Sequence, residues 1–255
     1  MPIDSNACNL SPVRAGLPVR LTIVATCAIA CFVATWTIAC IASAASAGGL
    51  GYTTQVTEGL ITSYSRQFGS VARERIASWM DFSRAEKGAR RVASLVDVDA
   101  TGTDLDVLKS VNAYFNRLPF VTDLSHWGVA DYWATPAEMS ASNGGDCEDY
   151  AISKYFLLKE LGVPVERLRI TYVKAISINQ PHMVLAYYPS PGAEPLILDN
   201  LEDGVRPASE RKDLVPVYSF NDEDVVIARD ARKSNPLQIR AWHDLQKRLE
   251  AEARL

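Results

Sequence analysis

The spacing of hydrophobic residues changes part-way along this chain. In its earlier part apolar residues recur every three or four positions, which is typical of helices that bury one face. Later, short β-rich runs bounded by turn residues predict strands. The predicted helices are 66–80, 101–118 and 147–161, with another in the tail from residue 235, and the predicted strands are 168–176, 182–188, 195–200 and 215–220. Helices followed by strands favour an α+β fold in which helices pack on an antiparallel sheet.

Capping and turn residues locate the ends of several elements. Thr103 or Asp104 can cap the second helix, and Gly162 is placed to end the third. Residues 131–145 carry a proline and an Asn-Gly-Gly run, so we expect a loop there. Because no Gly-, Ser- or Pro-rich linker interrupts the later sequence, we predict one domain over residues 48–255.

The first 47 residues differ from the rest of the chain. Arg14 and Arg20 precede an uncharged apolar run over residues 21–47 that ends in small residues. This order is typical of an export signal, and we therefore expect the domain to lie outside the cytoplasm. The run is also close to the roughly 20 residues that cross a bilayer. Residues 21–43 as an uncleaved inner-membrane anchor are therefore the alternative to a signal peptide.

Charge and cysteine content narrow the function further. The net charge of −4 gives no electrostatic basis for binding nucleic acid. Four of the five cysteines lie in or before the N-terminal apolar run, so the domain keeps only Cys147. A lone thiol in an oxidising compartment is either a small buried hydrophobic residue or a functional one. The count alone leaves both interpretations open.

The stretch GGDCEDYA, residues 144–151, favours a functional thiol. Cys147 falls in the first turn of a predicted helix, where unpaired N–H groups and the helix dipole favour a thiolate. The two preceding glycines allow the backbone to approach a substrate closely. The acids around the thiol oppose the thiolate; they are Asp146, Glu148 and Asp149. Complementing the helix dipole is an alternative explanation for these acids, and the one we favour for Asp149.

A cysteine nucleophile needs a base, which is nearly always histidine. We expect His243 on the surface of the tail helix, and prefer His182, which opens a strand, over His126 in a loop. The turn-rich loop PSPGAE joins two predicted strands as a hairpin and would make Asp199 the cross-strand neighbour of His182. Asp199 would then orient the imidazole, although a solvent-facing strand end is the alternative for this residue alone.

These segments together resemble the bacterial transglutaminase-like cysteine proteinases, specifically the LapG-type periplasmic adhesin proteases. The resemblance extends over about residues 70–255 and implies a papain-like transglutaminase core. The segments that carry it are DYWATPAE, GGDCEDYAISKYFLLKELGVP, LRITYVKA, HMVLAYY, LILDN and VYSFN.

The resemblance implies a calcium-dependent cysteine endopeptidase. Cys147, His182 and Asp199 match the catalytic residues of the family, and Asp146 and Glu148 match acids that bind Ca²⁺. The implied substrate is a large repeat-containing surface adhesin, cut near its N-terminus so that it is released and the biofilm disperses. The implied partner is the periplasmic domain of an inner-membrane cyclic di-GMP receptor.

Two other classes of function fit the same scaffold. The first is another transglutaminase-fold acyl transferase or an amidase, because a Cys-His-Asp set serves all three chemistries. The second is a non-catalytic binding module, which the presence of all three residue types disfavours. Trp127 and Trp133 are expected either to line a substrate groove or to pack in the core, and the backbone near Trp133 is a candidate oxyanion donor.

Overall fold

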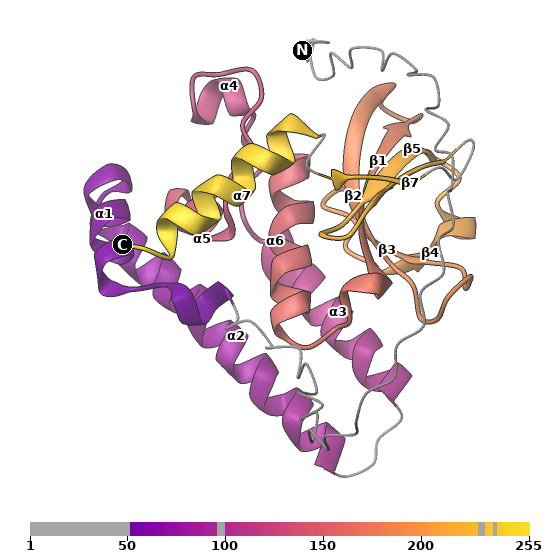
Figure 1. Ribbon diagram of the computed structural model, residues 1–255, viewed down its shortest axis with the longest axis horizontal. Helices are drawn as coiled ribbons and strands as arrows, with labels where there is room; N and C mark the ends of the chain where they lie inside the picture. Colours follow the sequence, from indigo (N-terminus) through magenta and orange to yellow (C-terminus); the bar gives the residue numbers. More distant parts are fainter. Residues whose placement is uncertain (1–51, 96–99, 229–232, 237–238) are drawn as a thin grey trace, which may run out of the picture. The chain divides into compact units, whose positions relative to one another are not determined.

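The computed structural model describes residues 52–95, 100–228, 233–236 and 239–255, which form helices and one antiparallel sheet (Figure 1). This confirms the predicted α+β class. Within the described ranges, no helix combines the length and apolar character that a membrane crossing requires. The predicted signal peptide or anchor, residues 1–47, lies outside the described residues.

The helices surround one central helix, α6. Helices α3 and α5 pack against α6, and α2 packs against α1, α3 and α5. The helices are α1 (Glu58–Phe68), α2 (Val71–Leu95), α3 (Ala100–Asn116), α4 (Asp123–His126), α5 (Pro136–Ser142), α6 (Cys147–Glu160) and α7 (Arg240–Glu252), with 3₁₀ turns η1 (Tyr52–Gln55), η2 (Val165–Arg167) and η3 (Ala208–Glu210).

The sheet has seven described strands in the order β4-β3-β2-β1-β5-β6-β7, each antiparallel to its neighbour. The strands are β1 (Leu168–Ala175), β2 (Gln180–Tyr187), β3 (Leu196–Leu198), β4 (Arg206–Pro207), β5 (Leu214–Phe220), β6 (Val225–Ile227) and β7 (Lys233–Ser234). The sequence predicts β1, β2, β3 and β5. The other strands have two or three residues, too few to show a hydrophobic period.

Helix α6 is the helix that packs directly on the centre of the sheet, against β1 and β2 (Figure 1). Its residues from Asp149 to Leu158 are all buried, because the sheet covers one side and other helices cover the rest. Tyr155 and Phe156 pack against Trp242 of α7, which adds an aromatic cluster to this core. The helix therefore has no solvent-facing stripe and holds its N-terminal residue at a fixed place relative to β2.

Three boundaries differ from those that the sequence predicts. The predicted helix 66–80 is two helices, which break at Gly69 with a φ of 88°. Asp104 does not cap α3; it is buried inside that helix, 2.6 Å from Arg90 and 3.2 Å from Arg167. Part of the predicted loop 131–145 is helix α5.

A capping box explains the unexpected helix α5. The Glu138 N–H donates to the Thr135 hydroxyl at 3.0 Å, and the Thr135 N–H donates to the Glu138 carboxylate at 2.8 Å. Pro136 follows as the first helical residue, where its missing N–H has no cost. The proline that signalled a loop in the sequence is thus the start of a helix.

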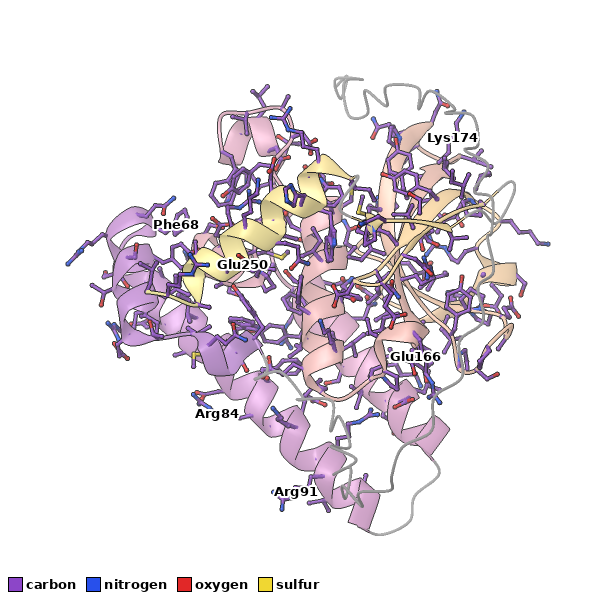
Figure 2. All side chains as sticks on the ribbon, viewed as in Figure 1. Phe68, Arg84, Arg91, Glu166, Lys174 and Glu250 are labelled. Atoms are coloured by element: carbon purple, nitrogen blue, oxygen red, sulfur yellow. The ribbon has the colours of Figure 1, made fainter. Side chains whose placement is uncertain are left out.

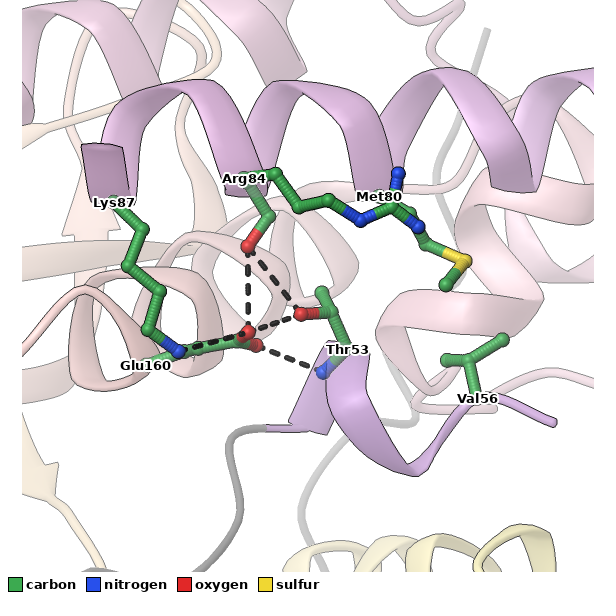
Figure 3. Close-up of a pocket in the computed structure, with 7 residues that line it drawn as sticks. Thr53, Val56, Met80, Arg84, Lys87 and Glu160 are labelled. Carbon is green, nitrogen blue, oxygen red and sulfur yellow. Dashed lines mark hydrogen bonds and ion pairs between the residues drawn. The ribbon is translucent and has the colours of Figure 1, made fainter. Parts of the chain in front are cut away.

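The far end of α6 anchors the segment that begins the described part of the chain. Glu160 accepts a hydrogen bond from the Thr53 N–H at 2.8 Å and one from the Ser83 hydroxyl at 3.3 Å (Figure 3). The three residues help to line a cavity of about 320 Å³ between η1 and α2. Glu160 follows Cys147 by thirteen positions along α6, or about 20 Å along the helix axis. This cavity is therefore remote from the thiol.

Glu252 ties α7 to three other parts of the helical layer. Its buried carboxylate accepts hydrogen bonds from the hydroxyls of Tyr52, Tyr64 and Thr135. On the preceding turn, Arg248 lies over the Tyr132 ring at 4.4 Å and donates to the Trp133 carbonyl. Burial raises the pKa of Glu252 to about 7 despite these donors.

The raised pKa of Glu252 predicts a pH-dependent stability. Between the usual value of 4.5 and about 7, the folded protein keeps this proton while the unfolded chain has lost it. Stability contributed by this group therefore falls as pH rises through that window. We expect Glu252→Gln to lose this dependence. Between pH 5 and pH 8 the free energy of unfolding of the wild type should therefore fall by about 2 kcal/mol relative to that of the variant.

Urea denaturation at several pH values measures this difference. Glu250→Gln is the control, because Glu250 lies on the same helix with its side chain 70% exposed. Parallel pH curves for Glu252→Gln and the wild type would contradict the prediction.

Candidate active site

Cys147 is the first residue of α6, and its half-buried side chain packs at the border of the core. Close packing accounts for the two glycines before it. A Cβ on Gly145 would lie 2.4 Å from the Asp149 carboxylate, and one on Gly144 would lie 2.7 Å from the Pro119 carbonyl. Gly144 also has a φ of 154°. The glycines therefore allow the chain to fit beneath the helix tip.

The acids beside the thiol act on it directly. The Cys147 thiol donates to Glu148 Oε2 at 3.1 Å. Burial and then the charges of Glu148 and Asp146 raise the thiol pKa well above its ordinary value. The Met183 backbone N–H has the opposite effect and lowers the thiol pKa. With these acids ionised and no cation bound, the protonated thiol is the favoured form.

His182 and Asp199 form a buried pair on the other side of the site. His182 Nε2 lies 2.7 Å from Asp199 Oδ1, and both side chains are at most 4% exposed. The hairpin register pairs Leu185 with Leu198, so Asp199 continues opposite Val184 and meets His182 diagonally. The sequence predicted a register with His182 directly opposite Asp199, which differs from the observed register by two residues. A shift of two keeps both side chains on one face of the sheet, so they still meet.

Asp199 is held as an anion by several donors. Arg211 Nη2 lies 2.7 Å from Asp199 Oδ2, and the Leu201 N–H donates to Oδ1 at 3.0 Å. Burial alone would raise the pKa of Asp199, but the hydrogen bond and charge of His182, with these two donors, lower it to about 2. Arg211 is in turn held by Asp213, at 2.9 Å and 3.1 Å. Asp199 therefore stays charged beside the imidazole at neutral pH.

Strand β2 brings the thiol and the imidazole into one region. The backbone N–H that lowers the pKa of the Cys147 thiol belongs to Met183, the residue after His182. In the described part of the chain, no hydrogen bond joins the thiol to the imidazole, because the thiol proton is directed to Glu148. Since Nε2 of His182 is occupied by Asp199, Nδ1 is the ring nitrogen left for a reacting group.

The other two histidines lie elsewhere. His126 ends α4 and packs edge-on against Trp127 at 4.7 Å, and His243 lies half-buried on α7. Trp127 also packs on Tyr132 at 4.6 Å, and Trp133 is buried and stacked on Phe220 at 5.8 Å. Both tryptophans therefore serve packing.

Acids from three segments gather around the tip of α6. Asp146 and Glu148 each lie in groups whose potential ligand atoms are within 4.8 Å of one another. The other carboxylates of these groups are Asp123, Asp131 and Asp149. Asp149 has a structural role as well, because it accepts N–H groups of Ala134 at 2.7 Å and of Asp146 at 3.2 Å. The expected helix-terminal role of Asp149 is thus observed.

The cluster has the properties of a cation site. Asp146 Oδ1 and Asp123 Oδ1 are buried without a hydrogen-bond partner among the described residues. Burial, followed by the neighbouring carboxylates, raises the pKa of Asp146 to about 9 and of Asp123 to about 7. Carboxylate oxygens crowded together without donors fit a hard divalent cation such as Ca²⁺, which binds six to eight oxygens.

The sequence did not identify Asp123, Asp131 or Arg211 as site residues. Asp131 is the first residue of the segment DYWATPAE, but no spacing in that segment marks it as a ligand. Asp123 and Arg211 are 24 and 64 residues from Cys147 in sequence, and their roles depend on folding. For Arg211 the one available signal is its place in the charged run ERKDL, which reads as a solvated loop.

Comparison with known proteins agrees with this geometry. The family model of the bacterial transglutaminase-like cysteine proteinases matches residues 70–214, which include Cys147, His182 and Asp199. The chain belongs to this family. A search of curated proteins gave no significant match.

Three solved structures of one relative are similar to this proteinase chain. LapG of Legionella pneumophila is 37% identical over 74% of this chain and 95% of its own, with a TM-score of 0.60. Its EGTA-treated form is 36% identical, and its calcium-bound form 38% identical. Each of these two covers 74% of this chain and 97% of its own, with a TM-score of 0.60. These matches confirm the predicted similarity to LapG-type proteinases and the predicted transglutaminase-like fold.

Removing Arg211 tests how the buried carboxylate of Asp199 is stabilised. We expect Arg211→Met to lower the free energy of unfolding by about 3 kcal/mol, because it leaves a buried charge without its guanidinium partner. Urea denaturation at pH 7 measures the loss. Arg206→Met is the control, since its ion pairs with Glu202 and Glu210 are exposed and should contribute at most about 1 kcal/mol. Equal losses in the two variants would contradict this assignment.

Proposed function

We propose that this proteinase is a calcium-dependent cysteine endopeptidase of the periplasm that cleaves a large surface adhesin near its N-terminus. The proposal is carried by a thiol at the tip of α6, adjoining the strand that holds a buried histidine–aspartate pair. The 37% identity to LapG over 95% of that protein supports the same assignment.

In the proposed mechanism, Cys147, His182 and Asp199 act as a catalytic triad. His182 Nδ1 accepts the thiol proton, and the thiolate attacks a peptide carbonyl of the substrate. His182 then donates that proton to the leaving amine as the C–N bond breaks and a thioester forms. Water, activated by the same imidazole, hydrolyses the thioester. Asp199 keeps the ring oriented and stabilises its protonated form, which the low pKa of Asp199 supports.

Asp146 and Glu148 are the proposed calcium ligands, and Asp123 and Asp131 are positioned to complete the site. A bound calcium ion would neutralise these acids and so lower the pKa of the neighbouring thiol. Glu148 is the residue through which this matters most, because its carboxylate accepts a hydrogen bond from the thiol. If the Glu148 carboxylate bound calcium instead of the thiol, the thiol proton would be free to transfer to His182.

The cellular role follows from the same proposal. Release of the adhesin would detach cells and disperse a biofilm. Export would depend on residues 1–47, either as a cleaved signal or as an anchor over residues 21–43. The proposed regulator is the periplasmic domain of an inner-membrane cyclic di-GMP receptor, which would bind the protease and withhold it from the adhesin.

Cleavage of a purified N-terminal adhesin fragment tests the activity. We expect cutting in calcium and none in excess EGTA. Cys147→Ala and His182→Ala should each reduce the rate by at least about 1000-fold, because the triad works as a unit. His243→Ala is the matched control and should keep wild-type activity, since His243 lies on α7 outside the site. Products analysed by mass spectrometry separate hydrolysis from cross-linking, and cutting that persists in EGTA would contradict calcium dependence.

Calcium binding can be measured without activity. We expect the melting temperature to rise with calcium concentration, since a ligand at about 100 times its Kd stabilises the folded state by about 2.7 kcal/mol. The double variant Asp146→Asn, Glu148→Gln should lose this rise. Glu166→Gln should keep it, because Glu166 is exposed in η2, beyond the end of α6 remote from Cys147 (Figure 2). A rise that survives the double variant would place the ion elsewhere.

A further inference from the structure

Two buried residues behind the histidine–aspartate pair connect it to the helix that carries the thiol. We infer that Asn116 and Lys154 are positioning residues that hold Asp199 in place against His182. Asn116 is the last residue of α3, and Lys154 lies in the middle of α6. The inference rests on the proposed catalytic role of Asp199, because neither residue would contact the substrate.

Asn116 holds the backbone of Asp199. Its Nδ2 donates to the Asp199 carbonyl at 2.9 Å, and it lies 3.4 Å from the Glu202 carbonyl and from Asp203 Oδ1. The carboxylate of Asp199 is held independently by His182, Leu201 and Arg211. Asn116 therefore fixes the peptide about which the side chain of Asp199 would otherwise turn.

Lys154 fixes the orientation of the Asn116 amide. Lys154 Nζ donates to Asn116 Oδ1 at 2.8 Å, which leaves only the Nδ2 side of the amide to face Asp199. The ammonium group also lies over the Tyr150 ring at 5.6 Å. Lys154 follows Cys147 by seven residues, about two turns, so both lie on one face of α6. Cys147 and Lys154, which orients the amide that holds Asp199, thus lie on one rigid helix.

The burial of Lys154 is costly, which argues against an incidental contact. Its side chain is 0% exposed, and among the described residues its nitrogen has one hydrogen-bond acceptor for three donors. Burial lowers the pKa of Lys154 to about 7, and the charges of Asp199 and Asp203 counteract that effect. A methionine or leucine would fill the same position in the core without this cost.

Asp199 needs such support because its backbone lies outside the hydrogen-bonded ladder of the sheet. Strand β3 ends at Leu198, so the ladder of backbone hydrogen bonds to β2 stops one residue before Asp199. Its contact with His182 is diagonal and lies beyond that ladder. A small pivot at this peptide would misplace the carboxylate, and misplacement by about 1 Å can slow catalysis about 100-fold.

Substitution of both residues, with a neighbour as control, tests the inference. Asn112 lies one turn earlier on α3 and donates to the Asp203 carbonyl at 3.0 Å and to the Glu202 carbonyl at 3.4 Å, but not to Asp199. We expect Asn116→Ala and Lys154→Met to lower kcat by about 10- to 100-fold with little change in KM. Asn112→Ala should keep both constants. Asn116→Asp keeps the Lys154 contact and the volume but cannot donate to Asp199, and should resemble Asn116→Ala.

The pH profile separates positioning from loss of fold. A misplaced Asp199 no longer orients the imidazole of His182, so we expect the alkaline limb of the pH profile of kcat to move to lower pH in the Asn116 and Lys154 variants. NMR detection of the His182 Nε2 proton in the full chain reports its hydrogen bond to Asp199 without a substrate. Thermal melts check that each variant is folded.

The outcomes distinguish this inference from the proposed function. An active wild type whose Asn116 and Lys154 variants match Asn112→Ala in kcat and in the His182 Nε2 proton resonance would overturn the inference alone. A wild type that cuts no adhesin fragment in calcium would overturn the proposed function, while a shifted or lost His182 Nε2 proton resonance in the Asn116 and Lys154 variants, but not in Asn112→Ala, would still support the positioning role.

Discussion

The rest of the structure depends on the packing of α6 against β1 and β2. Because every residue from Asp149 to Leu158 is buried, this helix cannot turn or slide without exposing core side chains. The packing sets Cys147 against the Met183 N–H at one end and Lys154 against Asn116 in the middle. One rigid element thus positions both the thiol and the support for the histidine–aspartate pair. A site on rigid secondary structure keeps its geometry better than one built from loops.

The fold treats its buried carboxylates in two opposite ways. Asp199 is surrounded by donors, which lower its pKa to about 2 and keep it charged. Within the described ranges, Asp146 and Asp123 each have an oxygen without a hydrogen-bond partner. Burial and the neighbouring acids raise the pKa of both carboxyls. The first arrangement suits a fixed anion that orients an imidazole, and the second suits a place for a cation. Acids flank the thiol because the second arrangement is built around it.

Helix α7 supports the site from the other side of the helical layer. Arg248 and Glu252 contact Trp133 and Thr135, within the segment that leads from Asp131 to α5. The Ala134 N–H in that segment donates to Asp149, which caps α6 beside the thiol. The C-terminal part of the chain is thereby connected to the helix tip through a short series of hydrogen bonds, although about 100 residues separate them in sequence.

The sequence by itself determined the α+β class, helix α6 with its glycine end at Gly162, strands β1, β2, β3 and β5, and the placing of His182 and Asp199 on one hairpin. These features follow from local periods and turn residues, which act over a few positions. Tertiary structure alone decided that Asp123, Arg211 and Lys154 join the same region, because burial and distance between remote segments have no local signature. It also decided that the thiol proton faces Glu148, since that contact requires the packed helix tip. The helix over residues 136–142 is a different case, because its capping box is a local signal that the neighbouring loop residues obscured.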